Sequence, residues 1–196
     1  MTDERALVSL EASRSEDFRR THETSVKIDN KIYAVAGIYV AVLSAIIGNL
    51  ALGTLDDGMY KQAFFASTIP AISGGIIHLR KSFSPKEYSE GMGVNSFEPL
   101  ETYERYLKAR IMFLNSGVER NCNANSLKSV YLNHSVTLLL AAPLVAFLST
   151  CIAVLFNKIA GKGSTIGISL FAFIVAVVIT AIIYHFVLRV KKPNRP

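Results

Sequence analysis

The sequence predicts an all-α membrane protein with four transmembrane helices and a cytoplasmic helical insert between the second and the third. Of its 196 residues, 51% are hydrophobic and only 18% are charged, below the roughly 25% of an average soluble domain. The hydrophobic residues form four blocks long enough to cross a bilayer, which takes about 20 mostly apolar residues. A long polar segment separates the second block from the third. This composition excludes a disordered chain and argues against a soluble enzyme.

Residues 1–31 are expected to form a cytoplasmic N-terminal tail that is partly helical. They carry mixed charge without proline or glycine, and a mixed-charge helix usually presents a solvated face. Apolar positions are sparse, namely Leu7, Leu10, Phe18 and Val26. Because no apolar stretch lies in this tail, a cleavable signal peptide is not expected.

Two transmembrane hairpins are predicted at 32–79 and 135–188. The four spans are placed at 32–55, 62–79, 135–156 and 165–188. The second span is the least apolar, because it carries several hydroxyl residues, Pro70 and the Gly74–Gly75 pair. These residues permit a kink or a close approach of another helix.

The distribution of basic residues predicts the orientation. Of the 21 lysines and arginines, all but Lys61, Lys158 and Lys162 lie in 1–31, 80–134 or the basic tail 189–196. The positive-inside rule therefore places both termini and the insert in the cytoplasm of a multi-pass protein of the cell inner membrane. The net charge of +6 then reflects this rule and attraction to anionic lipid. Acidic and basic residues alternate in both polar segments, so direct nucleic-acid binding is not expected.

The four spans contain no Asp, Glu, Lys or Arg. Proton relays and most ion-coupled transporters hold ionisable groups at this depth. A secondary transporter is therefore disfavoured, whereas a pore lined by hydroxyl groups or backbone remains open.

The first span carries small residues at spacings of three and four, which place them on one helical face. They are Ala34, Gly37, Ala41, Ser44, Gly48 and Ala51. Small residues let two helices approach closely in lipid. The partner is either another helix of the same chain or a second copy. We expect a homo-oligomer, with Gly37, Ala41, Ser44 and Gly48 as candidate packing residues.

The insert at 80–134 divides into three parts. Residues 80–98 are rich in Ser, Gly and Pro and are expected to be irregular. From Pro99 onward, apolar residues recur at helical spacing and predict an amphipathic helix: Leu100, Tyr103, Leu107, Ile111, Leu114 and Val118. Its apolar face must pack against the N-terminal tail, a neighbouring subunit or a partner protein.

Residues 119–134 are expected to form a stalk, a helix that continues into the third span. Asn121, Asn125 and Lys128 share one of its faces. Such a face either sets the register of a helix pair, as a polar coiled-coil position does, or binds a small ligand such as a nucleotide. The candidate residues for binding a ligand or partner are Tyr103, Arg110, Asn121, Asn125 and Lys128.

Metal and cofactor sites are not predicted. His78, His134 and His185 fall at the cytoplasmic ends of three spans, where histidines usually cap helices or meet lipid head groups, although converging histidines can bind haem or a metal. Cys122 and Cys151 have neither zinc-site nor redox-motif spacing. No nucleophile–base arrangement or phosphate loop is present, so an enzyme is not expected.

The order of these parts resembles one loose family. The segment Ile28-Asp29-Asn30-Lys31 precedes the first span, Tyr103-Glu104-Arg105-Tyr106-Leu107 lies in the insert, and Asn121, Asn125 and Lys128 lie in the stalk. This arrangement resembles the membrane effectors of prokaryotic antiviral systems of the Pycsar and SLATT types, in which an Asp-x-Lys motif before the first span recurs. Asp29 and Lys31 match that motif. The four spans also resemble the membrane subunit of the Kiwa defence system.

The resemblance implies an antiviral function without enzymatic activity. A cyclic nucleotide or a cytoplasmic partner protein would act on the insert of an inactive oligomer, and the stalk would pass the change to the spans and perturb the inner membrane. The main alternative is a membrane anchor or assembly subunit that recruits a soluble partner. A transporter and a haem-binding redox subunit are further alternatives.

Overall fold

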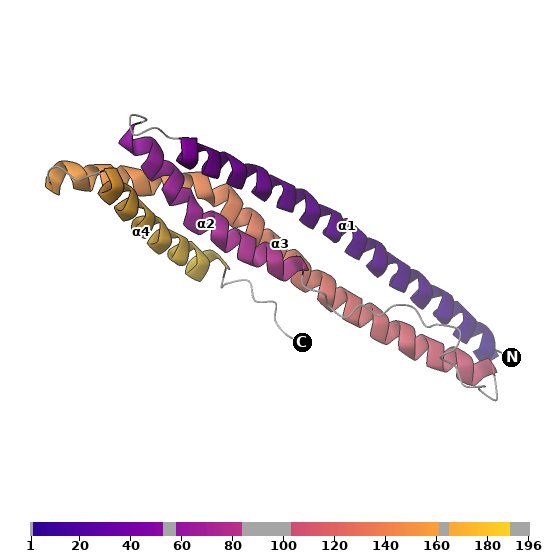
Figure 1. Ribbon diagram of the computed structural model, residues 1–196. Helices are drawn as coiled ribbons and strands as arrows, with labels where there is room; N and C mark the ends of the chain where they lie inside the picture. The colour runs from indigo at the N-terminus through magenta and orange to yellow at the C-terminus, as the bar shows by residue number, and fades with distance from the viewer. Residues whose placement is uncertain (1, 53–57, 84–102, 161–164, 189–196) are drawn as a thin grey trace. The chain divides into compact units, whose positions relative to one another are not determined.

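The computed structural model describes residues 2–52, 58–83, 103–160 and 165–188, and every one of these except Gly58 lies in a helix. The helices are α1 (Thr2–Leu52), α2 (Met59–Phe83), α3 (Tyr103–Ala160) and α4 (Thr165–Ile183), with a π-helical turn η2 (Tyr184–Leu188) after α4 (Figure 1). The all-α prediction is confirmed for the described residues. Each predicted span overlaps one helix, except that residues 53–55 of the first span lie outside the described residues and residues 184–188 of the fourth form η2.

The chain divides into two compact units. Unit 1 comprises Met1–Lys31 and Phe83–Ser129, and unit 2 comprises Ile32–Ser82 and Val130–Pro196. Helices α1 and α3 each contribute residues to both units. The boundary after Lys31 falls where the charge-free segment of the sequence begins.

Among the described residues, three helical segments are long and apolar enough to cross a membrane: Glu4–Asn49, Tyr103–Ile159 and Ile166–Phe186. These lengths and compositions are those of a membrane protein. Helix α2 has 25 residues but is not among the three. Its proline, its glycines and its hydroxyl residues lower its mean hydropathy, as the sequence already indicated. Instead, α2 carries small and polar residues that are buried in unit 2, including Ala63, Ser67 and Ala71. A helix enclosed by other helices needs fewer apolar side chains than one that faces lipid on most sides.

In unit 1, α1 and α3 run parallel, because successive contacts pair Glu11 with Arg110 and Asp29 with Lys128. Leu107, Ile111 and Leu114 are buried on α3, at the spacing of three and four that marks one face of a helix.

In unit 2, three helices meet at Tyr39 of α1. Its side chain is fully buried, and its hydroxyl donates a hydrogen bond to the backbone carbonyl of Ser135 on α3 at 2.7 Å. The Ser135 hydroxyl donates in turn to the Tyr39 oxygen at 3.2 Å. The same Tyr39 ring lies against the backbone of Gly75 on α2, where a Cβ atom would overlap the phenol oxygen. The Gly74–Gly75 pair therefore allows side chains of α1 and α3 to approach the backbone of α2 closely in unit 2.

At the other end of unit 2, small side chains bring α2, α3 and α4 together. Ala63, Ala153 and Ala172 form a buried cluster with Ile168. Beside it, the rings of Phe156 and Phe171 stack at 4.6 Å between centroids. Alanines at these positions let the helix backbones pack closely, which is the usual basis of helix association in lipid.

Two details of the sequence prediction were wrong. Residues 80–83, expected to be irregular, continue α2, because nothing in Arg-Lys-Ser-Phe breaks a helix. Tyr103, expected on the buried apolar face, is 57% exposed as the first residue of α3. Pro99, Leu100 and residues 84–98 lie outside the described residues.

Candidate functional site

Unit 1 holds together through a set of polar contacts between α1 and α3, which we call the polar interface. It consists of three pairs: Glu11 with Arg110, Thr21 with Asn125, and Asp29 with Lys128. Three of the five residues predicted from the sequence to bind a ligand or partner therefore contact α1. We treat this interface as the candidate functional site.

The Lys128–Asp29 pair is the most enclosed contact of the polar interface. The Lys128 ammonium lies 2.7 Å from Oδ1 of Asp29, and its side chain is only 8% exposed, whereas that of Asp29 is 40% exposed. The cation is thus shielded while its carboxylate retains contact with solvent. A buried ammonium depends on a nearby carboxylate because desolvation of an ion costs several kcal/mol. Separation of this pair is therefore more costly for Lys128 than for Asp29.

Asn121 and Asn125 form the amide layer of the interface. Nδ2 of Asn125 donates a hydrogen bond to the backbone carbonyl of Thr21 at 2.9 Å. Asn121, one turn earlier, is fully buried, and Ser25 of α1 is buried too. Buried amides between paired helices favour one register over others because a shifted register loses their hydrogen bonds. The geometry thus agrees with the register-setting interpretation of this face.

Arg110 joins the interface to the aromatic residues at the start of α3. Its Nε lies 2.7 Å from the carboxylate of Glu11, and its NH1 group donates to the Tyr106 hydroxyl at 3.0 Å. The hydrogen bond with Tyr106 raises the pKa of Arg110, and the charge of Glu11 adds to this effect. Tyr103 stacks on Tyr106 with centroids 6.3 Å apart but remains exposed.

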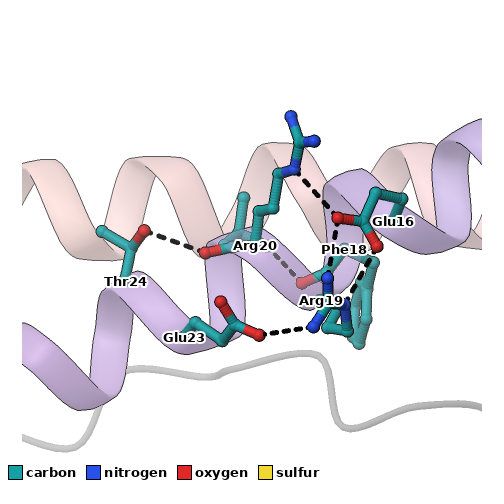
Figure 2. A network of polar contacts seen from close by, with 7 residues as sticks. Glu16, Phe18, Arg19, Arg20, Glu23 and Thr24 are labelled. Atoms are coloured by element: carbon teal, nitrogen blue, oxygen red, sulfur yellow. Dashed lines mark hydrogen bonds and ion pairs between the residues drawn. The ribbon is translucent and has the colours of Figure 1, made fainter.

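The outer face of α1 in unit 1 carries a separate ion-pair network. Figure 2 shows Glu16 between Arg19 and Arg20, with Glu23 completing the chain of contacts. The hydrogen bonds from Arg19 and Arg20 lower the pKa of Glu16 from 4.5 to about 2. All these side chains are well exposed, so solvent and salt weaken the attraction. This face is the solvated, mixed-charge surface expected from the sequence.

The small-residue stripe of the first span lies away from the other described helices. Gly37, Ala41 and Ser44 are exposed, and an added Cβ would meet nothing within 4 Å at either Gly37 or Gly48. Among the described residues, this stripe therefore does not pack against another helix of the same chain. Self-association through Gly37, Ala41, Ser44 and Gly48 stays a prediction.

Two of the three histidines considered for metal or haem binding meet. His78 and His134 contact each other with ring centroids 5.2 Å apart, whereas His185 contacts the neighbouring Phe186. Among the described residues, no group of three or more His, Cys, Asp or Glu side chains is placed to hold a metal ion.

Sequence analysis missed the α1 side of the polar interface. Glu11 and Ser25 lie 14 residues apart, and Thr21, Ser25 and Asp29 follow one another at spacings of four, but the tail was interpreted as a solvated helix. The search for an apolar face passed over them because the contact face here is polar. The heptad spacings that join Glu11 to Ser25 and Ile32, and Thr21 to Ile28, were the signal that could have identified the face.

No protein-family model, curated protein or solved structure matches this chain.

Proposed function

We propose that this protein is the membrane component of an antiviral defence system and perturbs the inner membrane when a signal or partner acts on unit 1. The observation that carries the proposal is the Asp29–Lys128 pair. Asp29 belongs to the Asp-x-Lys motif before the first apolar block, and Lys128 belongs to the stalk. The two features that supported the family resemblance are thus in contact.

A triggered effector needs an element with two arrangements that the trigger binds unequally. The polar interface suits this role because its ion pairs and amide hydrogen bonds can be exchanged for water or for a ligand at little net cost, unlike buried apolar contacts. Helix α3 then continues from residue 103 to residue 160 as one element. A cyclic nucleotide or a cytoplasmic partner protein that competes for Arg110, Asn125 or Lys128 would alter the pairing of α1 with α3.

In this proposal all four helices cross the inner membrane, with both termini and the insert in the cytoplasm. Helix α2 crosses despite its polar residues because other helices cover them. The exposed stripe at Gly37, Ala41, Ser44 and Gly48 is the packing face of a homo-oligomer, in which spans from several copies act on the bilayer together.

The test is membrane potential in bacterial cells that express the chain and the neighbouring genes of its native locus, with and without phage. We expect depolarisation only after infection. Asp29→Lys and Lys128→Asp should each abolish this infection-dependent response, either by silencing it or by making depolarisation constitutive. The double charge reversal should restore the response, because it rebuilds the ion pair.

A matched control is the exposed pair Glu104–Lys108, which lies within one helix at 2.6 Å. Reversing both of its charges should leave the response unchanged. If infection leaves the membrane potential of the wild type unchanged, the effector proposal is wrong and the membrane-anchor alternative is favoured. If the single reversals at Asp29 and Lys128 behave as the wild type does, the polar interface is not the switching element.

A further inference from the structure

A layer of rings surrounds His78 in unit 2, and we call His78, His134, Tyr131 and Tyr184 the histidine layer. The His78 ring is stacked on Tyr184 at 5.6 Å and on Tyr131 at 6.1 Å, with interplanar angles of 28° and 29°. Its third neighbour, His134, meets it edge to face at 5.2 Å. The layer therefore joins α2, α3 and η2.

His78 is enclosed and incompletely hydrogen-bonded. The residue is 5% exposed, and Nδ1 of its imidazole has no hydrogen-bond partner among the described residues. A neutral imidazole tolerates such a place because stacking compensates in part for the missing hydrogen bond. An imidazolium does not, because burying a charge without a counter-charge is costly.

The described residues of unit 2 include no acidic side chain. The only acidic residues that the sequence places in this unit are Asp56 and Asp57, which precede α2 by two or three residues. His78 lies 19 residues after Met59, the first residue of α2, which corresponds to roughly 30 Å of α-helix at 1.5 Å per residue. The nearby ionisable groups are instead basic or phenolic: His134 and Tyr131 from α3, Tyr184 from η2, and Lys81 from α2 itself, whose ammonium lies 5.8 Å from the Tyr131 ring centroid.

We infer that His78 makes the packing of α2 against α3 and η2 sensitive to pH, so that protonation of this side chain loosens unit 2. A proton on His78 places a positive charge beside His134 and Lys81, in a unit whose described residues include no carboxylate. The faces of Tyr131 and Tyr184 attract an imidazolium through cation–π contacts, but this gain is smaller than the cost of desolvating an ion without a counter-ion. The chain relieves the cost by exposing His78 to water.

The direction of the effect follows from proton uptake. An exposed imidazole protonates near pH 6.5, so the unfolded or opened chain binds a proton at this position more readily than the packed layer does. Stability therefore rises with pH through this range. It is fully present above about pH 7 and is lost progressively as the pH falls below about 6.5. This inference does not depend on the proposed function.

The test compares thermal unfolding of the purified full-length protein in detergent micelles at pH 7.5 and pH 5.5. We expect the melting temperature of the wild type to fall by about 3–5 °C. His78→Phe retains a stacking ring that cannot be protonated, and it should remove most of this fall. His185→Phe is the matched control, because His185 is exposed and contacts only Phe186 among the described ring pairs; it should retain the full fall.

Two outcomes would overturn the inference: an equal fall in the wild type and in His78→Phe, or removal of the fall by His134→Phe but not by His78→Phe. A measurement on the wild type alone covers the case in which His78→Phe does not fold. Hydrogen exchange of residues 72–82, corrected for the intrinsic rate at each pH, should be at least tenfold faster at pH 5.5. Residues 142–153 should change little, and equal protection of 72–82 at both pH values would contradict the inference.

Discussion

Units 1 and 2 use the same two helices, α1 and α3, but hold them together by different chemistry. On α3 the buried positions recur every three or four residues in both units. In unit 1 this face ends in Asn121, Asn125 and Lys128, whereas in unit 2 it consists largely of small or apolar residues such as Ala142 and Ala153. A helical spacing can therefore persist along one helix while the interactions that it presents change completely.

In the proposed topology, with unit 1 in the cytoplasm and unit 2 in the bilayer, the surroundings explain the difference. Next to water, charged and amide side chains can pair across a helix interface while their outer edges stay hydrated, as Asp29 does. Among lipid chains, apolar side chains gain nothing by leaving lipid for a neighbouring helix, so close backbone approach through small residues provides the association. Unit 2 accordingly depends on close steric fit, whereas unit 1 adds charge pairs and hydrogen bonds to the buried apolar side chains of Leu107, Ile111 and Leu114. Three predictions test this contrast.

The largest effect is expected at Gly75. In Gly75→Ala the new Cβ overlaps the Tyr39 hydroxyl, and the buried ring must move and weaken its hydrogen bond to Ser135. We expect unit 2 to lose about 2–3 kcal/mol of stability, measured by circular dichroism during thermal unfolding in detergent. Gly58→Ala is the matched control: Gly58 has nothing within 4 Å and lies outside the proposed packing face, so the substitution should cost about 1 kcal/mol or less. Equal effects at the two glycines would show that steric fit does not govern unit 2.

A smaller and asymmetric effect is expected at the ion pair of unit 1. Asp29→Asn leaves the enclosed Lys128 ammonium without the Asp29 carboxylate and should cost about 2 kcal/mol. Lys128→Met leaves a carboxylate that solvent can reach and should cost about 1 kcal/mol or less. Chemical denaturation of both variants and of the double variant would measure the difference. Equal costs, or a larger cost for Lys128→Met, would contradict the burial argument.

The smallest effect is expected on the outer face of α1. Because Arg19 and Arg20 lower the pKa of Glu16 to about 2, the ionised carboxylate favours the folded state above about pH 4.5, and this contribution is lost as the pH falls from 4.5 toward 2. Glu16→Gln should reduce that acid dependence only slightly, and less still in high salt. The pH dependence of helix content, measured in low and in high salt, would reveal this contribution to stability. An effect at Glu16 as large as that at Asp29 would mean that exposed and enclosed ion pairs contribute equally to stability.

The helices themselves could be predicted closely from the sequence. Charge-free blocks and the periodicity of Leu107, Ile111 and Leu114 depend on local composition and spacing, and the structure places helices there. The candidate site was predicted only on its α3 side. Asn125 and Lys128 share a face by spacing alone, but their partners Thr21 and Asp29 lie about 100 residues away. No local pattern specifies which distant side chain completes a polar pair.

By itself, the sequence determined that the chain is helical and apolar enough for a membrane, because backbone hydrogen bonding in lipid and hydrophobic composition are local properties. The tertiary structure decided which faces are used. It seated Tyr39 on Gly75, enclosed Lys128 beside Asp29, gathered three rings around His78, and turned the glycine stripe of α1 away from the other described helices. Each of these outcomes depends on the register between neighbouring helices, which decides which of their residues meet. The spacing of residues along a single helix carries no information about that register.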